Sequence, residues 1–356
     1  MNFLKKHGYK LIGSLLVLYT LFVGLLTPLK PGITFLSTNS IDQGQYLNVM
    51  INGYNTHFKS ASDNRAWLKI DSVYAVEALK LTPISETEIM AYFLLPNFAP
   101  DSAKILPLGV LMDNSIDGHF ERPSAIFYKQ NSHYIQQGRT LWTQWPMNNL
   151  HTNTSFNFPY RNILQESIRN TYYHVPMWFA MIALFFYSMI LSIRFIRSND
   201  EALMIKSVAL IKVGFIFGVA GLLTGALWAK YTWGQYWSFD VKQNMSAIAL
   251  MIYGSLLVLR NSITDPHQAN KISAAYNIFA FAALIPLIFI IPRLTDSLHP
   301  GNGGNPAFGS GDLENTMRMV FYPAVLCWIL VGLWMAEITN RLDKISQKMT
   351  LFLHNK

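Results

Sequence analysis

The chain has 356 residues, of which 51% are hydrophobic and only 13% are charged, and this composition excludes an ordinary soluble protein. The net charge of +8 would suit nucleic acid if the Lys and Arg residues formed a patch, but they sit in short segments beside apolar blocks, so we predict no nucleic-acid partner. The single cysteine excludes an intramolecular disulfide and a thiolate metal cluster within the chain.

The first element is an apolar run from Leu11 to Leu29, preceded by three lysines. Such a run is either a signal peptide or a membrane span. The run is longer than a usual signal peptide core, and no small-x-small cleavage site precedes the Pro28–Pro31 break. We therefore expect residues 1–32 to form a retained transmembrane helix.

Residues 33–169 change in character, with short alternating segments and turn residues in place of long apolar runs. The Asn52-Gly53 pair predicts a β-hairpin between Tyr46–Ile51 and Tyr54–Phe58, because these residues tolerate the positive φ angles of a type I′ turn. Further strands are expected at 67–81, 89–95 and 124–135. This segment is predicted to be a mostly-β domain.

Five more apolar blocks of membrane-spanning character follow, at residues 175–196, 205–228, 245–259, 272–292 and 320–338. The block at 245–259 is short, so we expect its helix to begin within the preceding loop or to be tilted. The predicted fold is an all-α polytopic membrane bundle of about six helices with an inserted mostly-β extracytoplasmic domain. Residues 170–345 form its five-helix membrane domain, and 346–356 form a tail.

Basic residues fix the expected orientation, because cytoplasmic loops are enriched in Lys and Arg. With six spans, all four basic groups fall on one side of the membrane; they are Lys5, Lys6 and Lys10; Arg194, Arg197 and Lys206; Arg260 and Lys271; and Arg341, Lys344 and Lys348. We expect a bacterial inner-membrane protein with both termini cytoplasmic. The β domain and the loops 228–244 and 293–315 then face the periplasm.

This topology sorts the nine histidines. Three of them fall on the cytoplasmic side, namely His7, His267 and His354. Four belong to the β domain or its exit, where a surface position without a site function is expected; these are His57, His119, His133 and His151. His174 and His299 remain, both at the outer face. Pro176 fits the first turn of a helix, so His174 is expected at the start of the second span.

An aromatic segment, Gly225–Asp240, lies between these two histidines in the sequence and at the same face. Six of its sixteen residues are aromatic; they are Trp228, Tyr231, Trp233, Tyr236, Trp237 and Phe239. One interpretation is an interfacial aromatic belt. The other is a site for a large, flat metal macrocycle, because two imidazoles can ligate heme iron and aromatic rings can cover a porphyrin. Lys230, Lys242, Arg293 and Arg318 are candidate partners of heme propionates.

The segment Trp233–Asp240, with the sequence WGQYWSFD, resembles the tryptophan-rich motif of the heme-handling superfamily that includes CcmC, CcmF and CcsA. Tyr173–Pro176 and Ser297–His299 resemble the two histidine loops of the CcmC branch. By this resemblance, His174 and His299 are axial ligands of a heme b, and the heme-contacting residues are Trp228, Trp233, Gly234, Tyr236, Trp237 and Asp240. The resemblance also implies a heme chaperone or apocytochrome c as acceptor, and ABC transporter subunits as partners.

The chain departs from the family pattern at three places. Tyr236 and Phe239 stand where the family usually has Trp, and residues 241–244 match neither the CcmC nor the CcsA pattern. The β domain replaces what is normally a short loop. It is expected either to dock the heme acceptor or cover bound heme, or to stabilise the complex only.

Two alternative functions fit the sequence less well. A polytopic transporter of another small molecule, with the aromatic loop as its outer gate, usually carries charges at mid-bilayer. Here Lys212 is the only clear charge well inside a predicted span, and Glu337 lies near the end of another. A heme lyase would need a nucleophile and base at the outer face, and no such pair is evident. The sequence therefore predicts a heme-binding and delivery protein rather than an enzyme.

Overall fold

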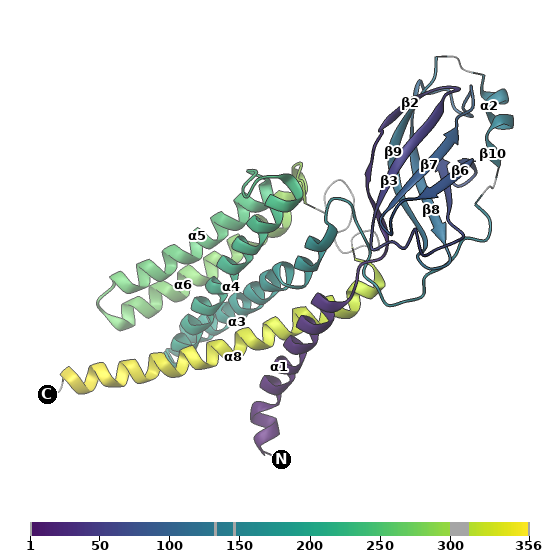
Figure 1. Cartoon of the computed structure of the whole chain (residues 1–356). Helices are drawn as coiled ribbons and strands as arrows, with labels where there is room; N and C mark the ends of the chain where they lie inside the picture. Colours follow the sequence, from purple (N-terminus) through teal and green to yellow (C-terminus); the bar gives the residue numbers. More distant parts are fainter. Residues whose placement is uncertain (1, 132–133, 145–146, 300–312, 355–356) are drawn as a thin grey trace. The chain divides into compact units, whose positions relative to one another are not determined.

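The computed structural model describes residues 2–131, 134–144, 147–299 and 313–354 (Figure 1), so His133 and most of the loop after His299 lie outside it. The chain divides into two compact units. One consists of residues 1–27 and 166–356 and is helical, and the other consists of residues 28–165 and is rich in strands.

The helical unit contains the six span-length apolar helices that the sequence predicts. They are built on α1 (Asn2–Leu26), α3 (His174–Ser198), α4 (Glu201–Trp233), α5 (Val241–Ser262), α6 (Pro266–Ile285) and α8 (Asn315–His354). A 3-10 helix, η1 (Gln165–Tyr172), leads into α3. The short apolar block at 245–259 does belong to a longer helix that begins in the preceding loop, at Val241. The six candidate spans are consistent with a polytopic membrane protein.

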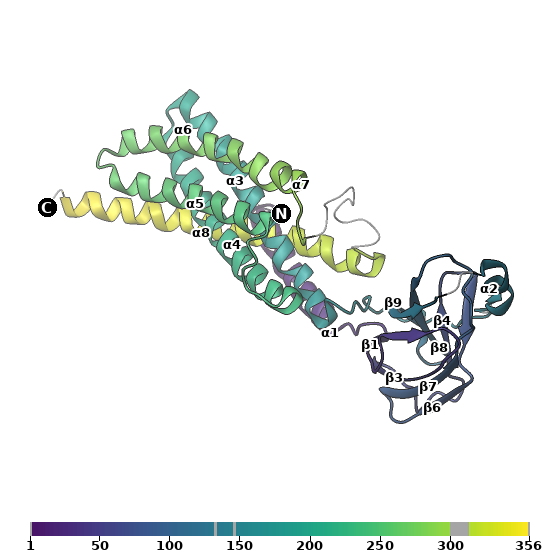
Figure 2. The same cartoon turned by 90° about the horizontal axis from the view of Figure 1, so that it is seen from above.

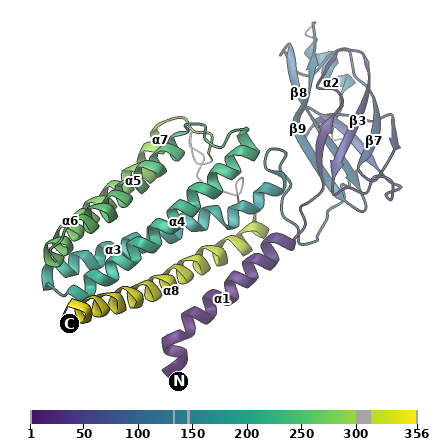
Figure 3. The same ribbon diagram turned by 60° about the vertical axis from the view of Figure 1, so that its left-hand side comes forward.

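The helices of this unit pack around a shared apolar core. Helices α5 and α6 lie side by side (Figure 2), and α8 runs along both α1 and α3 (Figure 3). Phe185 of α3 stacks on Tyr253 of α5 with ring centroids 3.5 Å apart. Buried polar groups also join the helices, since Asn277 of α6 donates to Ser188 of α3 at 2.7 Å. Hydrogen bonds between buried side chains of this kind hold membrane helices together.

Helix α6 ends in an irregular segment. A π-helical turn, η2 (Pro286–Ile290), follows it directly and leads into the short helix α7 (Ile291–Leu294). The N–H of Ile291 donates to the carbonyl of Pro286, five residues earlier. Such a turn accommodates one residue more than an α-helical turn does. The segment sets the direction in which the chain leaves the bundle towards His299.

The strand-rich unit consists of two sheets. The four-stranded sheet has the order β1-β3-β7-β6, and the six-stranded sheet has the order β10-β5-β4-β8-β9-β2. The strands are β1 (Gly32–Leu36), β2 (Ser40–Asp42), β3 (Tyr46–Tyr54), β4 (Arg65–Lys69), β5 (Tyr74–Glu77), β6 (Lys80–Pro83), β7 (Glu88–Leu94), β8 (Ile105–Asn114), β9 (Gly118–Lys129) and β10 (Thr143–Gln144). Residues from both sheets share one apolar core.

The predicted hairpin at Asn52-Gly53 is wrong. Strand β3 continues through both residues, because Gly53 pairs with Ile33 of β1 and Asn52 pairs with Glu88 of β7. The Asn52 side chain also donates to the Glu88 carboxylate at 3.2 Å. Pairing on both sides outweighs the local turn preference of the two residues.

The sequence also misplaced other elements of this unit. The segment 67–81, predicted as one strand, lies in three short strands. The strand predicted at 124–135 was drawn too long, because β9 ends at Lys129 and the helix α2 (Ile135–Leu141) begins at the last predicted residue. Strand β8 was not predicted; it contains Pro107 and Gly109, which are unusual within strands.

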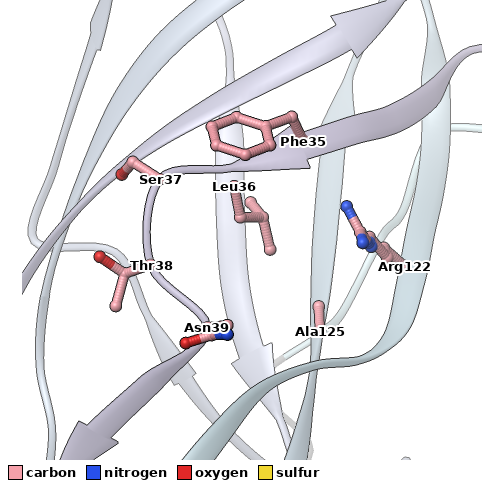
Figure 4. A pocket seen from close by; sticks show the side chains of 7 residues that line it. All are labelled: Phe35, Leu36, Ser37, Thr38, Asn39, Arg122 and Ala125. Atoms are coloured by element: carbon pink, nitrogen blue, oxygen red, sulfur yellow. The ribbon is translucent and has the colours of Figure 1, made fainter.

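The strand-rich unit has a pocket of about 360 Å³ where the β1–β2 connection meets β9 (Figure 4). Its lining residues are Phe35, Leu36, Ser37, Thr38, Asn39, Arg122 and Ala125. Arg122 donates to the carbonyl of Thr34 at 2.9 Å. None of the site residues predicted from the sequence lines this pocket.

Candidate functional site

His174 is the first residue of α3, as the sequence predicts, with Pro176 in the first turn. Its Nδ1 lies 3.0 Å from the carbonyl oxygen of Gly221 and 3.2 Å from Oγ1 of Thr224, both on α4. A carbonyl oxygen only accepts hydrogen bonds, so Nδ1 must carry the proton. The nitrogen with the free lone pair is therefore Nε2.

Close packing fixes the position of the His174 ring. The ring contacts Trp178 and Trp228 edge-on, with centroids 6.2 Å and 5.8 Å away. Gly225 faces it from α4, and a Cβ atom at that position would lie only 2.6 Å from Cε1 of His174. The imidazole therefore has little space in which to move toward α4.

The aromatic loop begins where α4 ends, at Trp233. Gly234 caps the helix with φ +81°, a left-handed conformation that favours glycine. Tyr236 is 58% exposed, and the Lys230 Nζ lies 5.6 Å from the centre of its ring. The indole N–H of Trp237 donates to Asn244 of α5 at 3.2 Å. The loop thus keeps rings at its surface while its ends are anchored to helices.

Asp240 connects this loop to the segment that carries His299. Its carboxylate caps α5 by accepting from the N–H of Lys242 at 2.8 Å. It also accepts from the N–H of Leu298 at 2.8 Å, from the hydroxyl of Ser297 at 3.1 Å and from Nδ1 of His299 at 2.9 Å. Burial would raise the pKa of Asp240, but these hydrogen bonds and the nearby His299 outweigh it and lower the pKa.

His299 is consequently held in a defined tautomer. Because the Asp240 carboxylate accepts from Nδ1, this nitrogen carries the proton and Nε2 has the free lone pair. The Trp233 ring lies edge-on to the imidazole with centroids 4.7 Å apart. Burial lowers the pKa of His299, although the Asp240 carboxylate opposes this shift.

The predicted site residues thus fall into two contact groups. His174 contacts Trp228, while His299 contacts Trp233 and Asp240. The two imidazoles are close enough to interact electrostatically. Gly234, Tyr236 and Trp237 lie in the loop that joins Trp233 to Asp240, but no hydrogen bond or ring contact between them and either histidine was found in the described residues.

Sequence reasoning missed several residues that position the histidines. Gly221, Thr224 and Gly225 lie on the face of α4 that receives His174, and Ser297 helps to fix the His299 segment. The spacing of Gly221 and Gly225, four residues apart on one helix face, was the available signal for close packing.

Two of the histidines in the strand-rich unit each contact a carboxylate. His57 contacts Asp117 at 2.7 Å and His151 contacts Asp113 at 2.9 Å. Among the residues that the structure describes, no group of three or more His, Cys, Asp or Glu side chains is arranged to hold a metal ion.

Residues 157–299 match the family model of the cytochrome C assembly protein. The heme exporter protein C of Haemophilus influenzae is 21% identical over 143 residues, which cover 39% of this chain and 56% of that protein. The heme exporter protein C of Bradyrhizobium diazoefficiens is 26% identical over 131 residues, covering 36% and 49%. The cytochrome c biogenesis protein CcsA of Prochlorococcus marinus subsp. pastoris is 40% identical over 65 residues, covering 18% and 21%.

The chain therefore spans about half or less of the length of these curated relatives. The matched region contains both histidines and the aromatic loop. The resemblance predicted from the three motifs is confirmed for this region.

Proposed function

We propose, from the premise that this chain is a CcmC-like cytochrome c maturation protein, that it binds heme b through His174 and His299 and presents it to a heme chaperone or an apocytochrome c. The observation that carries this proposal is that the two imidazoles adopt the same tautomer. Each has its Nδ1 proton committed to an oxygen of the protein, so each offers Nε2 to iron.

The residues around the two imidazoles suit a porphyrin. Trp228 and Trp233 pack against the histidines, and the loop from Gly234 to Asp240 adds the rings of Tyr236 and Trp237. Aromatic side chains bury a large apolar area, and the O–H of Tyr and the N–H of Trp can still form hydrogen bonds. Heme, when bound, would supply the iron that the acceptor finally receives. The propionates would pair with cations of this end of the bundle, for which Lys230, Lys242, Arg293 and Arg318 are proposed.

The two ligands are supported differently. His174 belongs to a helix and is enclosed by α4, whereas His299 belongs to a loop and depends on Asp240 for its orientation. We expect His299 to be the ligand that gives way when an acceptor supplies its own. This function requires binding and release but no bond-making by the chain, so we propose a delivery protein rather than an enzyme.

The proposed setting follows from the basic loops and from the relatives. The chain would lie in a bacterial inner membrane with its termini cytoplasmic and its histidine end periplasmic. ABC transporter subunits would be partners in the membrane, and the strand-rich unit, also periplasmic, would dock the acceptor.

The alternative transporter function gains no specific support from the two charges noted in the sequence. Lys212 pairs with Asp343 of α8 at 2.9 Å, and Glu337 pairs with Lys10 of α1 at 2.7 Å. Each of these two charges therefore has an ion-pair partner on another helix.

The test is an absorption spectrum of the detergent-purified chain titrated with heme. The wild type should show a bis-histidine Soret band, and His174→Ala or His299→Ala should weaken or abolish it. His267→Ala is the matched control, because His267 pairs with Glu201 at the other end of the bundle. Unchanged heme binding in both site variants would refute the proposal.

A further inference from the structure

A second polar feature of the helical unit lies at the end of the bundle opposite to His174. It is a pocket of about 370 Å³ between α1, α3, α4 and α8, here called the basic-end pocket. Its lining residues are Tyr9, Tyr187, Lys206, Leu210, Leu333, Ala336, Glu337 and Asn340. Polar and apolar side chains thus line one cavity.

The charges around this pocket are unbalanced. The Glu337 carboxylate already accepts from Lys10, from Arg341 and from the hydroxyl of Tyr9. Lys206 contacts the hydroxyl and the ring of Tyr187 instead, and no carboxylate pairs with it among the residues that the structure describes. The one carboxylate of the lining is thus neutralised by Lys10 and Arg341, which lie outside the lining, and Lys206 is the charge within the lining that can attract an anion.

Two hydrogen-bonding groups in the pocket are incompletely used. The Tyr187 hydroxyl accepts from Lys206 at 2.7 Å, so its own proton is available to an acceptor. The side-chain oxygen of Asn340 is buried and has no donor within the described part of the chain. A buried oxygen of this kind is unfavourable unless a donor reaches it. A ligand that suits the pocket therefore offers both an anionic oxygen and a hydroxyl group.

We propose that the basic-end pocket binds the headgroup of an anionic phospholipid that carries hydroxyl groups, such as phosphatidylglycerol. The phosphate would accept from Lys206 and Tyr187, and a headgroup hydroxyl would donate to Asn340. Leu210 and Leu333 would contact the start of an acyl chain. Basic pockets between membrane helices bind acidic headgroups in this way.

A lipid fits this place better than free phosphate does. The pocket lies among helices of span length, and the apolar side chains in its lining, Leu210, Leu333 and Ala336, offer nothing to a small hydrated ion. The inference does not rest on the proposed heme function, because none of the heme-site residues lines the pocket.

The experiment is a lipid titration of the full chain in neutral detergent, followed by native mass spectrometry and by the thermal midpoint. Phosphatidylglycerol should bind and raise the midpoint, whereas phosphatidylcholine and inorganic phosphate should not. Lys206→Gln should weaken phosphatidylglycerol binding roughly fivefold or more, since each basic residue near a membrane surface contributes about 1 kcal/mol. Lys271→Gln, an exposed lysine of α6 that does not line the pocket, is the matched control.

A further variant tests the hydroxyl contact. Asn340→Ala should weaken phosphatidylglycerol binding while leaving phosphatidic acid, which has no glycerol headgroup, unaffected. Equal binding of inorganic phosphate would show a simple anion site and overturn the proposal. Equal effects of Lys206→Gln and Lys271→Gln would show nonspecific attraction and would also overturn it. The thermal midpoint of each variant without added lipid, measured in parallel, shows whether the rest of the bundle is intact.

Discussion

Substitution of Asp240 by Asn separates the two roles of this carboxylate. Asn caps helices about as well as Asp does, so the start of α5 at Lys242 should persist. The remaining amide oxygen can still accept from Nδ1 of His299, but that bond loses its charge, and the new NH2 group cannot accept from the N–H of Leu298; hydrogen bonds to charged groups contribute about 1.5 to 3 kcal/mol. That range corresponds to roughly a 10- to 100-fold change in affinity, which is also the typical effect of removing a hydrogen-bond partner of a metal-ligating histidine.

The assay is a heme titration of Asp240→Asn by Soret absorbance in the same detergent as the wild type. Asp200→Asn provides the matched control, because Asp200 caps α4 by accepting from Ala202 at 3.0 Å and has no contact with a histidine in the described residues. We expect a large loss of heme affinity in Asp240→Asn and none in Asp200→Asn. Wild-type affinity in Asp240→Asn, or an equal loss in both variants, would refute the reasoning.

Two further predictions follow from packing and from charge. Gly225→Ala should reduce the heme affinity measured by Soret titration at least several-fold, because the new Cβ would displace the His174 ring. Gly254→Ala is the control and should leave the titration unchanged, because the atom nearest to its new Cβ would lie 3.4 Å away. In the strand-rich unit, burial would raise the pKa of Asp113, but hydrogen bonds led by the one from His151 lower it. The ionised Asp113 carboxylate therefore stabilises the folded unit above the pKa of about 4 that it has in the unfolded chain. This stabilisation is lost as the pH falls through the lower pKa of Asp113 in the folded state. Asp113→Asn should therefore destabilise this unit by about 3 kcal/mol at neutral pH and flatten its acid sensitivity, measured as protease cleavage within residues 28–165 of the full chain.

The sequence predicted the helices well because each span is a long apolar run, and length alone distinguishes such a run from a strand. It predicted His174 at a helix start because Pro176 marks a first turn. The strand-rich unit was predicted in character but not in detail. Asn52-Gly53 carries a strong local turn signal, and only the pairing of β3 with strands on both sides shows that the chain does not turn there.

The site was predicted as a set of residues but not as an arrangement. Asp240 and His299 are 59 residues apart, so no local pattern shows that one orients the other. The same holds for His174 and the Gly221 carbonyl, because a backbone acceptor leaves no trace in residue identity. Tertiary contacts of this kind determine which imidazole nitrogen is available, and the sequence alone does not specify them.

The π-helical turn between α6 and α7 has a consequence for the register of the polypeptide. A π turn behaves as a single-residue insertion in an α-helix, and each residue of an α-helix rotates the chain by about 100°. The π turn takes up this extra residue locally, so Ile291–Leu294 keep the direction they would have without it. Refolding of Pro286–Ile290 into regular α-helix, with no residue deleted, would rotate Ile291–Leu294 by about 100°. The His299 segment would then leave the bundle on another side, away from Asp240, so the wide turn itself sets the direction of the imidazole.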